Sequence, residues 1–553
     1  MEPIRGFITN RSRNYQLNII NLMKHAVRIY ARQEILSRTQ DGSFFKYTYK
    51  DAYERMQKLA NSLESLGVKI GDKIGVLAWN THQNFEIYYG LPGMGAVMVT
   101  LNLRLTPEDL KYIIKHSGIK LLILNEDLIP LAEKISEICT DVKSYVIITD
   151  KPIIDLRTSL NPIYSYEVLL KEASAVYEWP YLDENSTYAA CYTTGTTGKP
   201  KGVYYSHRVS YIQALAFCIT AHMNIYDVVF QLVPMFHVLG WSLPLASVYV
   251  GARIVFSGKW NLDDLEEMTD IIVKEGITLS GAVPTILMAM LENIKKMKTK
   301  PDFNRTRFIC GGSEPPIILM KELKELTGAE IQHSYGSTEA MAITTLNTSK
   351  PWLDKDLTEE ELWKLKQKQG QVVSGLDVKI IDEMGKKLPF DGTSSGEILI
   401  KGPWIAISYY NSEDTADLFT EDGFYKTGDA GSIDSEGYLK ITDRIKDVIK
   451  SGGEWISSID MENLLVSHPA ILEAVVVGVP HPKWEERPLA LIVLREGFDS
   501  LNKEEINELL LKKFAKWQLP DKILFVDSIP KTSVGKLNKK YIRTKYKDIL
   551  LNM

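Results

Sequence analysis

Cysteine is scarce in this chain, with four in 553 residues, at positions 139, 191, 218 and 310. No two of them are close enough for a C-x-x-C metal motif, and four are too few for a disulfide framework in a chain of this size. Their spacing therefore excludes a zinc ribbon, and their number excludes a disulfide-stabilised scaffold. It favours a reducing compartment.

Long apolar runs and an excess of charge of one sign are also missing. No stretch of about 18 uncharged apolar residues occurs, and residues 1–5 lack the apolar character of a signal peptide. Lysine and arginine number 65 against 70 aspartate and glutamate, a net charge of -5, so no overall attraction to nucleic acid or anionic membranes is expected. We therefore expect a soluble cytoplasmic protein with no nucleic-acid partner and no integral membrane association.

Apolar residues are plentiful, at 45% of the chain, which is enough to bury large cores. Polar, helix-like segments alternate with short runs rich in valine and isoleucine, such as residues 73–78 and 121–124. This alternation is typical of parallel strands joined by crossover helices, and it resumes at residues 253–256 and 278–283. We predict an α/β fold with a large N-terminal domain of two doubly wound lobes.

The pattern changes in the last third of the chain. Short alternating runs separated by Asp-Gly and Glu-Gly turns predict a small β-barrel-like unit over about residues 371–443. The remaining residues predict a small, mobile α+β domain with a helix over residues 503–517. We place the domain boundary between residues 1–443 and residues 444–553.

The most informative segment is residues 192–203, Tyr-Thr-Thr-Gly-Thr-Thr-Gly-Lys-Pro-Lys-Gly-Val. Its glycines let backbone N–H groups approach a polyanion, its hydroxyls donate hydrogen bonds, and its lysines neutralise charge. The spacing of Gly195 and Gly198 does not fit the Walker pattern, and no Gly-Lys-Ser/Thr follows. The composition indicates a loop that folds over the triphosphate of a nucleotide.

This segment resembles the phosphate loop of the adenylate-forming synthetases, the family that includes acyl-CoA synthetases, luciferases, aryl-CoA ligases and peptide-synthetase adenylation domains. Further segments match in the family's order, and the resemblance covers at least residues 190–537. These segments are residues 234–237, 311–315, 335–339, 425–429, 443–447 and 530–536.

The resemblance implies an acid–thiol ligase that uses ATP, Mg²⁺ and coenzyme A. Such enzymes form an acyl-adenylate from a carboxylic acid and ATP, and a thiol then attacks it. By resemblance Lys536 is the catalytic lysine, and Thr193 and Glu339 hold the metal and complete the catalytic set. Carboxylate oxygens suit Mg²⁺, and a displacement at phosphorus depends on charge neutralisation and positioning.

The same resemblance assigns an ATP site. Asp429 would accept hydrogen bonds from the ribose hydroxyls with Arg444 beside it, and Tyr335 would stack on the base. The full set is Thr193, Thr194, Gly195, Thr196, Thr197, Gly198, Lys199, Lys201, Gly312, Ser313, Glu314, Pro315, Ser334, Tyr335, Gly336, Ser337, Thr338, Asp429, Arg444 and Lys536.

The acyl pocket is assigned to His237, Trp241 and Gly336. Trp241 resembles a tryptophan that closes the acyl tunnel in medium- and long-chain fatty acyl-CoA synthetases, and acetyl-specific relatives carry tryptophan in place of Gly336. We infer room for a chain longer than acetate, in the short to medium aliphatic range. Because one methylene changes binding by only about 1–3 kcal/mol, chain length, a hydroxyl group and aryl preference stay open.

The family rotates its small domain between the two steps, and resemblance places the hinge at Lys446. Rotation would bring a coenzyme A channel, formed by Gly452, Gly453, Glu454 and Trp455, to the site. Alternatives are an adenylation enzyme that loads a carrier-protein phosphopantetheine or reacts with oxygen, an aryl-CoA ligase, and a nucleotide-binding regulatory protein. Relatives of the fatty-acyl subgroup are often dimers, so a homodimer is the partner that resemblance suggests.

Overall fold

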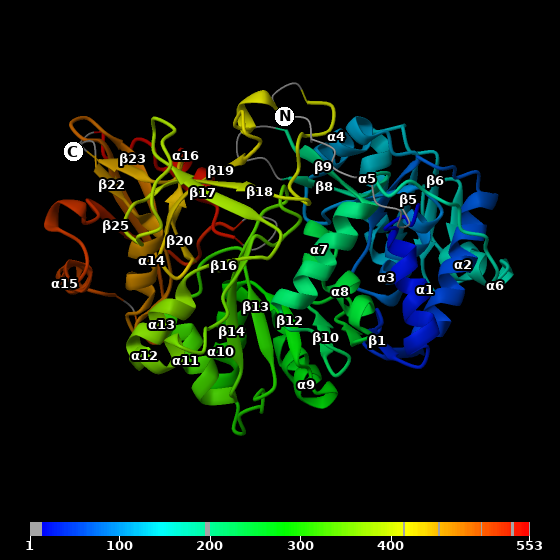
Figure 1. Ribbon diagram of the computed structural model, residues 1–553, viewed down its shortest axis with the longest axis horizontal. Coiled ribbons are helices and arrows are strands. Elements are labelled where there is room, and N and C mark those ends of the chain that lie inside the picture. Colours follow the sequence, from blue (N-terminus) through cyan, green and yellow to red (C-terminus); the bar gives the residue numbers. More distant parts are fainter. Residues whose placement is uncertain are drawn as a thin grey trace, which may run out of the picture.

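Three β-sheets organise the computed structural model, which describes residues 14–193, 199–412, 415–451, 454–498, 500–531 and 536–551. Figure 1 shows the first lobe on the right in blue and cyan, the second lobe at the lower centre in green, and the C-terminal part on the left in orange and red. The α/β class and the division into a large and a small part are confirmed.

The first sheet is parallel except for its last pair of strands, and its order is β7-β6-β5-β3-β4-β8-β9. Its strands are β3 (Lys73–Leu77), β4 (Val97–Thr100), β5 (Leu121–Asn125), β6 (Ser144–Ile148), β7 (Ile163–Ser165), β8 (Thr187–Thr193) and β9 (Lys201–Ser206). The helices of this lobe and the two that follow it are α1 (Ile19–Tyr30), α2 (Tyr49–Ser65), α3 (His82–Gly93), α4 (Pro107–Ser117), α5 (Ile129–Ile138), α6 (Tyr166–Glu172), α7 (His207–Thr220) and α8 (Leu243–Val250).

The second sheet joins the second lobe to the antiparallel unit in one continuous order, β17-β18-β19-β20-β16-β15-β14-β13-β12-β10-β11-β1-β2. Its parallel part and the edge hairpin are β1 (Glu34–Arg38), β2 (Phe44–Thr48), β10 (Val228–Gln231), β11 (Arg253–Phe256), β12 (Leu279–Ala282), β13 (Arg307–Cys310) and β14 (Glu330–Tyr335). Its antiparallel part is β15 (Thr345–Leu346), β16 (Gly370–Val372), β17 (Asp377–Ile381), β18 (Gly396–Lys401), β19 (Tyr425–Ile433) and β20 (Tyr438–Arg444). The helices are α9 (Leu265–Glu275), α10 (Pro284–Lys296), α11 (Ile317–Thr327), α12 (Leu353–Asp356) and α13 (Glu359–Gln367).

Strand periodicity explains how the two lobes share one core. Along β5, Leu121 and Ile123 join the core between the sheets, whereas Leu122 and Leu124 face α4 and α5 on the other side. Successive side chains of a strand point to opposite faces, so a strand covered on both sides is apolar throughout. Helices α1, α3, α7 and α8 fill the shared core, and α9, α10 and α11 cover the outer face of the second sheet.

The third sheet belongs to the C-terminal part and has the order β22-β21-β24-β23, with β25 beside β24. Its elements are β21 (Ile449–Ser451), β22 (Glu454–Ile456), α14 (Ser458–Val466), β23 (Ile471–His481), β24 (Glu485–Leu494), α15 (Lys503–Leu511), β25 (Lys522–Phe525) and α16 (Lys539–Lys545). The helix expected over residues 503–517 is shorter than predicted. It ends at Leu511, and a separate turn of 3₁₀ helix follows at residues 516–518.

None of the helices in these described ranges combines the length and the apolar character that a membrane crossing requires.

Candidate active site

The ends of the phosphate loop are fixed by an antiparallel hairpin. Thr193 ends β8 and pairs with Lys201 at the start of β9, and the Lys201 N–H donates to Thr193 Oγ1 at 3.4 Å. A Cβ on Gly202 would come within 2.8 Å of the Tyr192 ring, so glycine is needed at this position of the hairpin. Thr194, Gly195, Thr196, Thr197 and Gly198 lie outside the described residues.

Glu339 is held beside this hairpin by a tyrosine that the sequence motifs did not indicate. The Tyr409 hydroxyl donates to Glu339 Oε1, and the Ala406 N–H donates to the Glu339 carbonyl oxygen at 2.7 Å. The Lys201 ammonium lies 4.9 Å from the centroid of the Tyr409 ring. Tyr409 therefore connects the phosphate hairpin to the carboxylate expected to hold the metal.

The oxygen donors at this point suit Mg²⁺. Glu339 offers a carboxylate and Thr193 a hydroxyl, and hard cations prefer oxygen ligands. Among the described residues, no three His, Cys, Asp or Glu side chains cluster closely enough to hold a metal on their own.

The predicted ribose site brings three motifs together. Tyr335 ends β14, and its hydroxyl donates to Asp429 Oδ2 at 2.5 Å. Arg444 Nε lies 3.6 Å from Asp429 Oδ1, because β19 and β20 pair these two residues directly. Burial raises the pKa of Asp429, while the positive charge of Arg444 opposes that rise.

Lys536 reaches the same place from the C-terminal part. Its Cε would lie 3.0 Å from a Cβ on Gly312, a residue whose φ of +92° also requires glycine. Burial, followed by the nearby charge of Arg444, lowers the pKa of Lys536 to about 8, while Asp429 and Glu339 act in the opposite direction. The chain is thus folded with its candidate catalytic lysine in the site.

The charge of Lys536 also affects the ionisation of His237. Burial, and then the charge of Lys536, lower the pKa of His237 to about 3, so its ring is neutral at physiological pH. A neutral imidazole here can line a pocket or accept a hydrogen bond.

A small, mostly apolar pocket lies beside these residues. It is lined by Phe217, Trp241, Leu243, Gly281, Ile309, Ser334, Ala342 and Ile343. The Trp241 ring would lie 3.1 Å from a Cβ on Gly311, the residue next to Gly312. Trp241, which lines the pocket, and Lys536 therefore lie next to neighbouring glycines.

Trp241 stands on an unusual turn, since residues 238–242 all have positive φ. Left-handed backbone costs about 1–2 kcal/mol for each residue other than glycine, so the surroundings must hold the turn in place. One such contact is the Ser242 hydroxyl, which donates to Gln213 Oε1 at 2.5 Å in the core. Such contacts hold the turn, and with it the Trp241 ring at the pocket wall.

Gly336, which the family resemblance assigned to the acyl pocket, is not among the residues that line this pocket. A Cβ at residue 336 would lie 1.6 Å from the carbonyl oxygen of Ala342. Its side-chain direction points into the backbone that follows β14, so this glycine is needed for a close approach of two chain segments.

Three more of the predicted residues, Glu314, Lys199 and Thr338, contact side chains from other segments of the chain. The Glu314 carboxylate is buried, which raises its pKa to about 7, and it accepts from Asn463 Nδ2 at 2.7 Å and Gln369 Nε2 at 3.1 Å. Lys199 lies over the Tyr112 ring at 5.2 Å. The Thr338 carbonyl accepts from the Tyr205 hydroxyl at 2.6 Å, which ties β9 to the segment that carries Glu339.

The expected coenzyme A segment is a hairpin between β21 and β22, in which Lys450 pairs with Trp455 and Ser451 with Glu454. Gly452 and Gly453 fall outside the described residues. Figure 1 places β22 at the outer edge of the C-terminal part, away from β8 and β9. Lys446 lies at the exposed junction after β20, where the Ile445 N–H donates to the Gly428 carbonyl at 2.9 Å.

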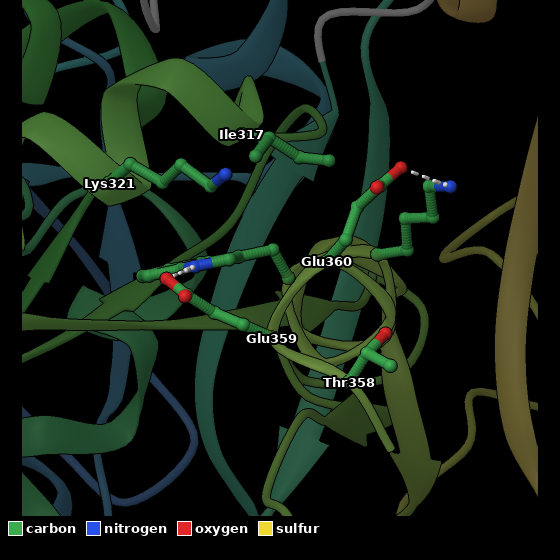
Figure 2. Close-up of a pocket in the computed structure, with 7 residues that line it drawn as sticks. Ile317, Lys321, Thr358, Glu359 and Glu360 are labelled. Carbon is green, nitrogen blue, oxygen red and sulfur yellow. Dashed lines mark hydrogen bonds and ion pairs between the residues drawn. The ribbon is translucent and has the colours of Figure 1, made fainter.

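A larger hollow of about 730 Å³ opens on the surface between α11 and α13. Figure 2 shows Ile317 and Lys321 on one side and Thr358, Glu359 and Glu360 on the other. It shares no residue with the nucleotide or acyl sites. Two of its charged side chains, Glu360 and Lys364, pair within α13 at 2.8 Å.

Comparison with known proteins agrees with this geometry. The family described as AMP-binding enzyme matches residues 24–410, and the family described as AMP-binding enzyme C-terminal domain matches residues 460–536. A long-chain-fatty-acid–CoA ligase of Thermus thermophilus is 40% identical over 96% of each chain, and a medium-chain-fatty-acid–CoA ligase of Ectopseudomonas oleovorans is 34% identical over 97% of each. The crystal structure of ATP-bound MatB from Rhodopseudomonas palustris aligns with a TM-score of 0.82 at 25% identity, over 97% of this chain and all of that one.

Proposed function

Because the chain belongs to the family of AMP-binding enzymes, we propose that it activates an aliphatic carboxylic acid of medium chain length and transfers the acyl group to coenzyme A. The protein is an AMP-forming acid–thiol ligase that uses ATP, Mg²⁺ and coenzyme A. The observation that supports the choice of acid is the mostly apolar pocket lined by Trp241, which lies next to Gly311 as Lys536 lies next to Gly312.

The pocket argues for an uncharged acyl tail. None of the described residues that line it is charged, and burying an unpaired charge there would be costly. Each buried methylene contributes about 0.8 kcal/mol, so binding should strengthen with length until the pocket is full.

In the first step a carboxylate oxygen of the acid attacks the α-phosphorus of ATP, and pyrophosphate leaves. Lys536 supplies a positive charge where negative charge accumulates, and Asp429 with Arg444 positions the ribose. Mg²⁺, when bound, neutralises phosphate charge, and Glu339 and Thr193 would hold it. His237, being neutral, adds no competing cation beside the acyl group.

In the second step the thiol sulfur of coenzyme A attacks the acyl carbonyl carbon, and AMP leaves. A single orientation cannot serve both steps, because Lys536 occupies the site while the β21–β22 hairpin lies away from it. We therefore place a rotation of residues 444–553 about Lys446 between the steps. It would bring Gly452, Gly453, Glu454 and Trp455 to the acyl-adenylate.

The test is a substrate series from acetate to palmitate, with AMP release measured in the presence and absence of coenzyme A. We expect release to depend on coenzyme A and to be fastest with medium-chain acids. AMP release that ignores coenzyme A but responds to a carrier protein would reverse the assignment of the acceptor. Fastest turnover with an aromatic acid would reverse the assignment of the acid.

A cytoplasmic location and a homodimer remain proposals. All four cysteines are unpaired and buried, which supports a reducing compartment. Leu215 and Ile219 on α7 and Tyr226 just beyond it are exposed apolar residues, as expected of a surface covered by a second copy. Light scattering of the wild type and of an Ile219→Asp variant tests this, with a dimer expected only in the wild type.

A further inference from the structure

One face of α10 is turned toward the C-terminal part. Met288, Glu292 and Lys296 recur every four residues and therefore lie on one side of the helix. Met288 packs against the core formed by α14, β23 and β24. Glu292 forms an ion pair with Arg495, and Lys296 Nζ lies 4.0 Å from the carboxylate of Glu496.

A second contact lies between the same two parts of the chain. Asn463 on α14 donates to Glu314 Oε1 at 2.7 Å, and the acceptor is buried. Glu314 follows Gly312 by two residues, so this contact anchors the segment that Lys536 touches. Gln369 Nε2 donates to the other carboxylate oxygen, which leaves both oxygens hydrogen-bonded.

Each of these contacts joins residues on opposite sides of Lys446. A rotation about that residue would separate the partners and expose a hydrogen-bonded buried carboxylate. Contacts that exist in only one orientation favour that orientation by their own free energy. Both contacts are present while Lys536 lies at Gly312.

We propose that Asn463 and Arg495 are positioning residues, which dock the C-terminal domain on Glu314 and α10 and thereby keep Lys536 in place for adenylate formation. The inference rests on the proposed two-step function. The docking contacts act through Lys536 and touch no reacting atom. They determine how much of the enzyme is ready for the first step and how readily it leaves that orientation for the second.

The test separates the two half-reactions in Asn463→Ala, Arg495→Ala and the double variant. We expect ATP–pyrophosphate exchange to fall about tenfold in each single variant, the effect of losing about 1.4 kcal/mol, and further in the double variant. Single-turnover conversion of preformed acyl-adenylate with coenzyme A should stay unchanged or become faster. A charge swap, Glu292→Arg with Arg495→Glu, should restore exchange. Lys364→Ala, whose cation pairs within α13, is the control and should leave both rates unchanged.

Energy transfer between two attached dyes measures the docking directly and does not depend on catalysis. The native cysteines are buried, so dyes can be attached selectively at Lys364→Cys on α13 and Lys503→Cys on α15. We expect energy transfer to show one predominant separation in the wild type and a shifted distribution in the Asn463→Ala, Arg495→Ala double variant. An unchanged distribution, or an equal loss of both half-reactions, would overturn the proposal. Absence of both half-reactions in the wild type would instead count against the proposed function, and energy transfer would still decide the docking.

Discussion

Burial and nearby carboxylates shift the pKa of the Lys536 ammonium group in opposite directions. Burial lowers its pKa to about 8, while Asp429 and Glu339 favour its charged form. The group is therefore protonated below about pH 8 in the free enzyme and neutral above it. Because the proposed role needs the positive charge, the first half-reaction should reflect this pKa.

The first prediction follows from that titration. The kcat/KM for pyrophosphate exchange should fall as pH rises through about 8, since the ammonium loses its proton. Lys536→Arg should retain its charge and lose this alkaline decline, and Lys536→Ala should lower the rate by about 10²- to 10³-fold. An alkaline decline that persists in the arginine variant would assign the titration to another group.

Tyr409 provides the second prediction. Tyr409→Phe removes the donor to Glu339 and keeps the ring beside Lys201. A hydrogen bond to a charged group contributes about 1.5–3 kcal/mol, so exchange at low Mg²⁺ should fall by about tenfold or more. Excess Mg²⁺ should restore much of the rate. The matched control is Tyr410→Phe, which removes a hydroxyl from the neighbouring ring stacked on Tyr204, and an equal loss in both variants would contradict the role of Tyr409.

At the scale of elements, the proposed acyl pocket is formed where α7, the turn after β10 and the strands β12 to β14 converge. Strands β12 and β13 contribute Gly281 and Ile309, and α7 contributes Phe217. A Cβ on Gly281 would lie 3.2 Å from the Trp241 ring, so the indole rests against bare backbone. Small residues on the strands thus leave room for the pocket, and larger residues on the helices form its opposite wall.

The third prediction concerns chain length. Phe217→Leu removes part of a buried ring from the pocket, so the preferred acid should become longer by a few carbons. Leu243→Phe adds bulk to the same pocket and should shift the preference toward shorter acids. The ratio of kcat/KM values for laurate and hexanoate measures both. Shifts in the same direction for the two variants would show that this pocket does not hold the acyl tail.

At the scale of the whole molecule, the C-terminal part presents one of its two candidate segments to the site. Lys536 is in the site, and β22, which carries the expected coenzyme A hairpin, is at the outer edge. The junction between the parts is short, because β20 ends at Arg444 and β21 begins at Ile449. A rotation must therefore be absorbed by very few backbone torsions.

The fourth prediction tests that junction. Lys446→Pro fixes one of those torsions, so pyrophosphate exchange should remain within a few-fold of the wild type while thioester formation slows strongly. Lys446→Ala removes the side chain and keeps the backbone freedom, so it should behave like the wild type in both steps. Equal losses of exchange and thioester formation in the proline variant would place the hinge elsewhere.

The amino-acid sequence by itself determined the α/β class, the family resemblance and the residues meant to carry the chemistry, because strand periodicity and the dense Thr/Gly/Lys segment are local patterns. Tertiary structure decided what no spacing encodes. Tyr409, Asn463 and Arg495 belong to residue types that are common on any surface, and they acquire roles only because distant segments meet at Glu339, Glu314 and Glu292. Gly336 shows the same limit, since its direction toward Ala342 depends on how two segments pack.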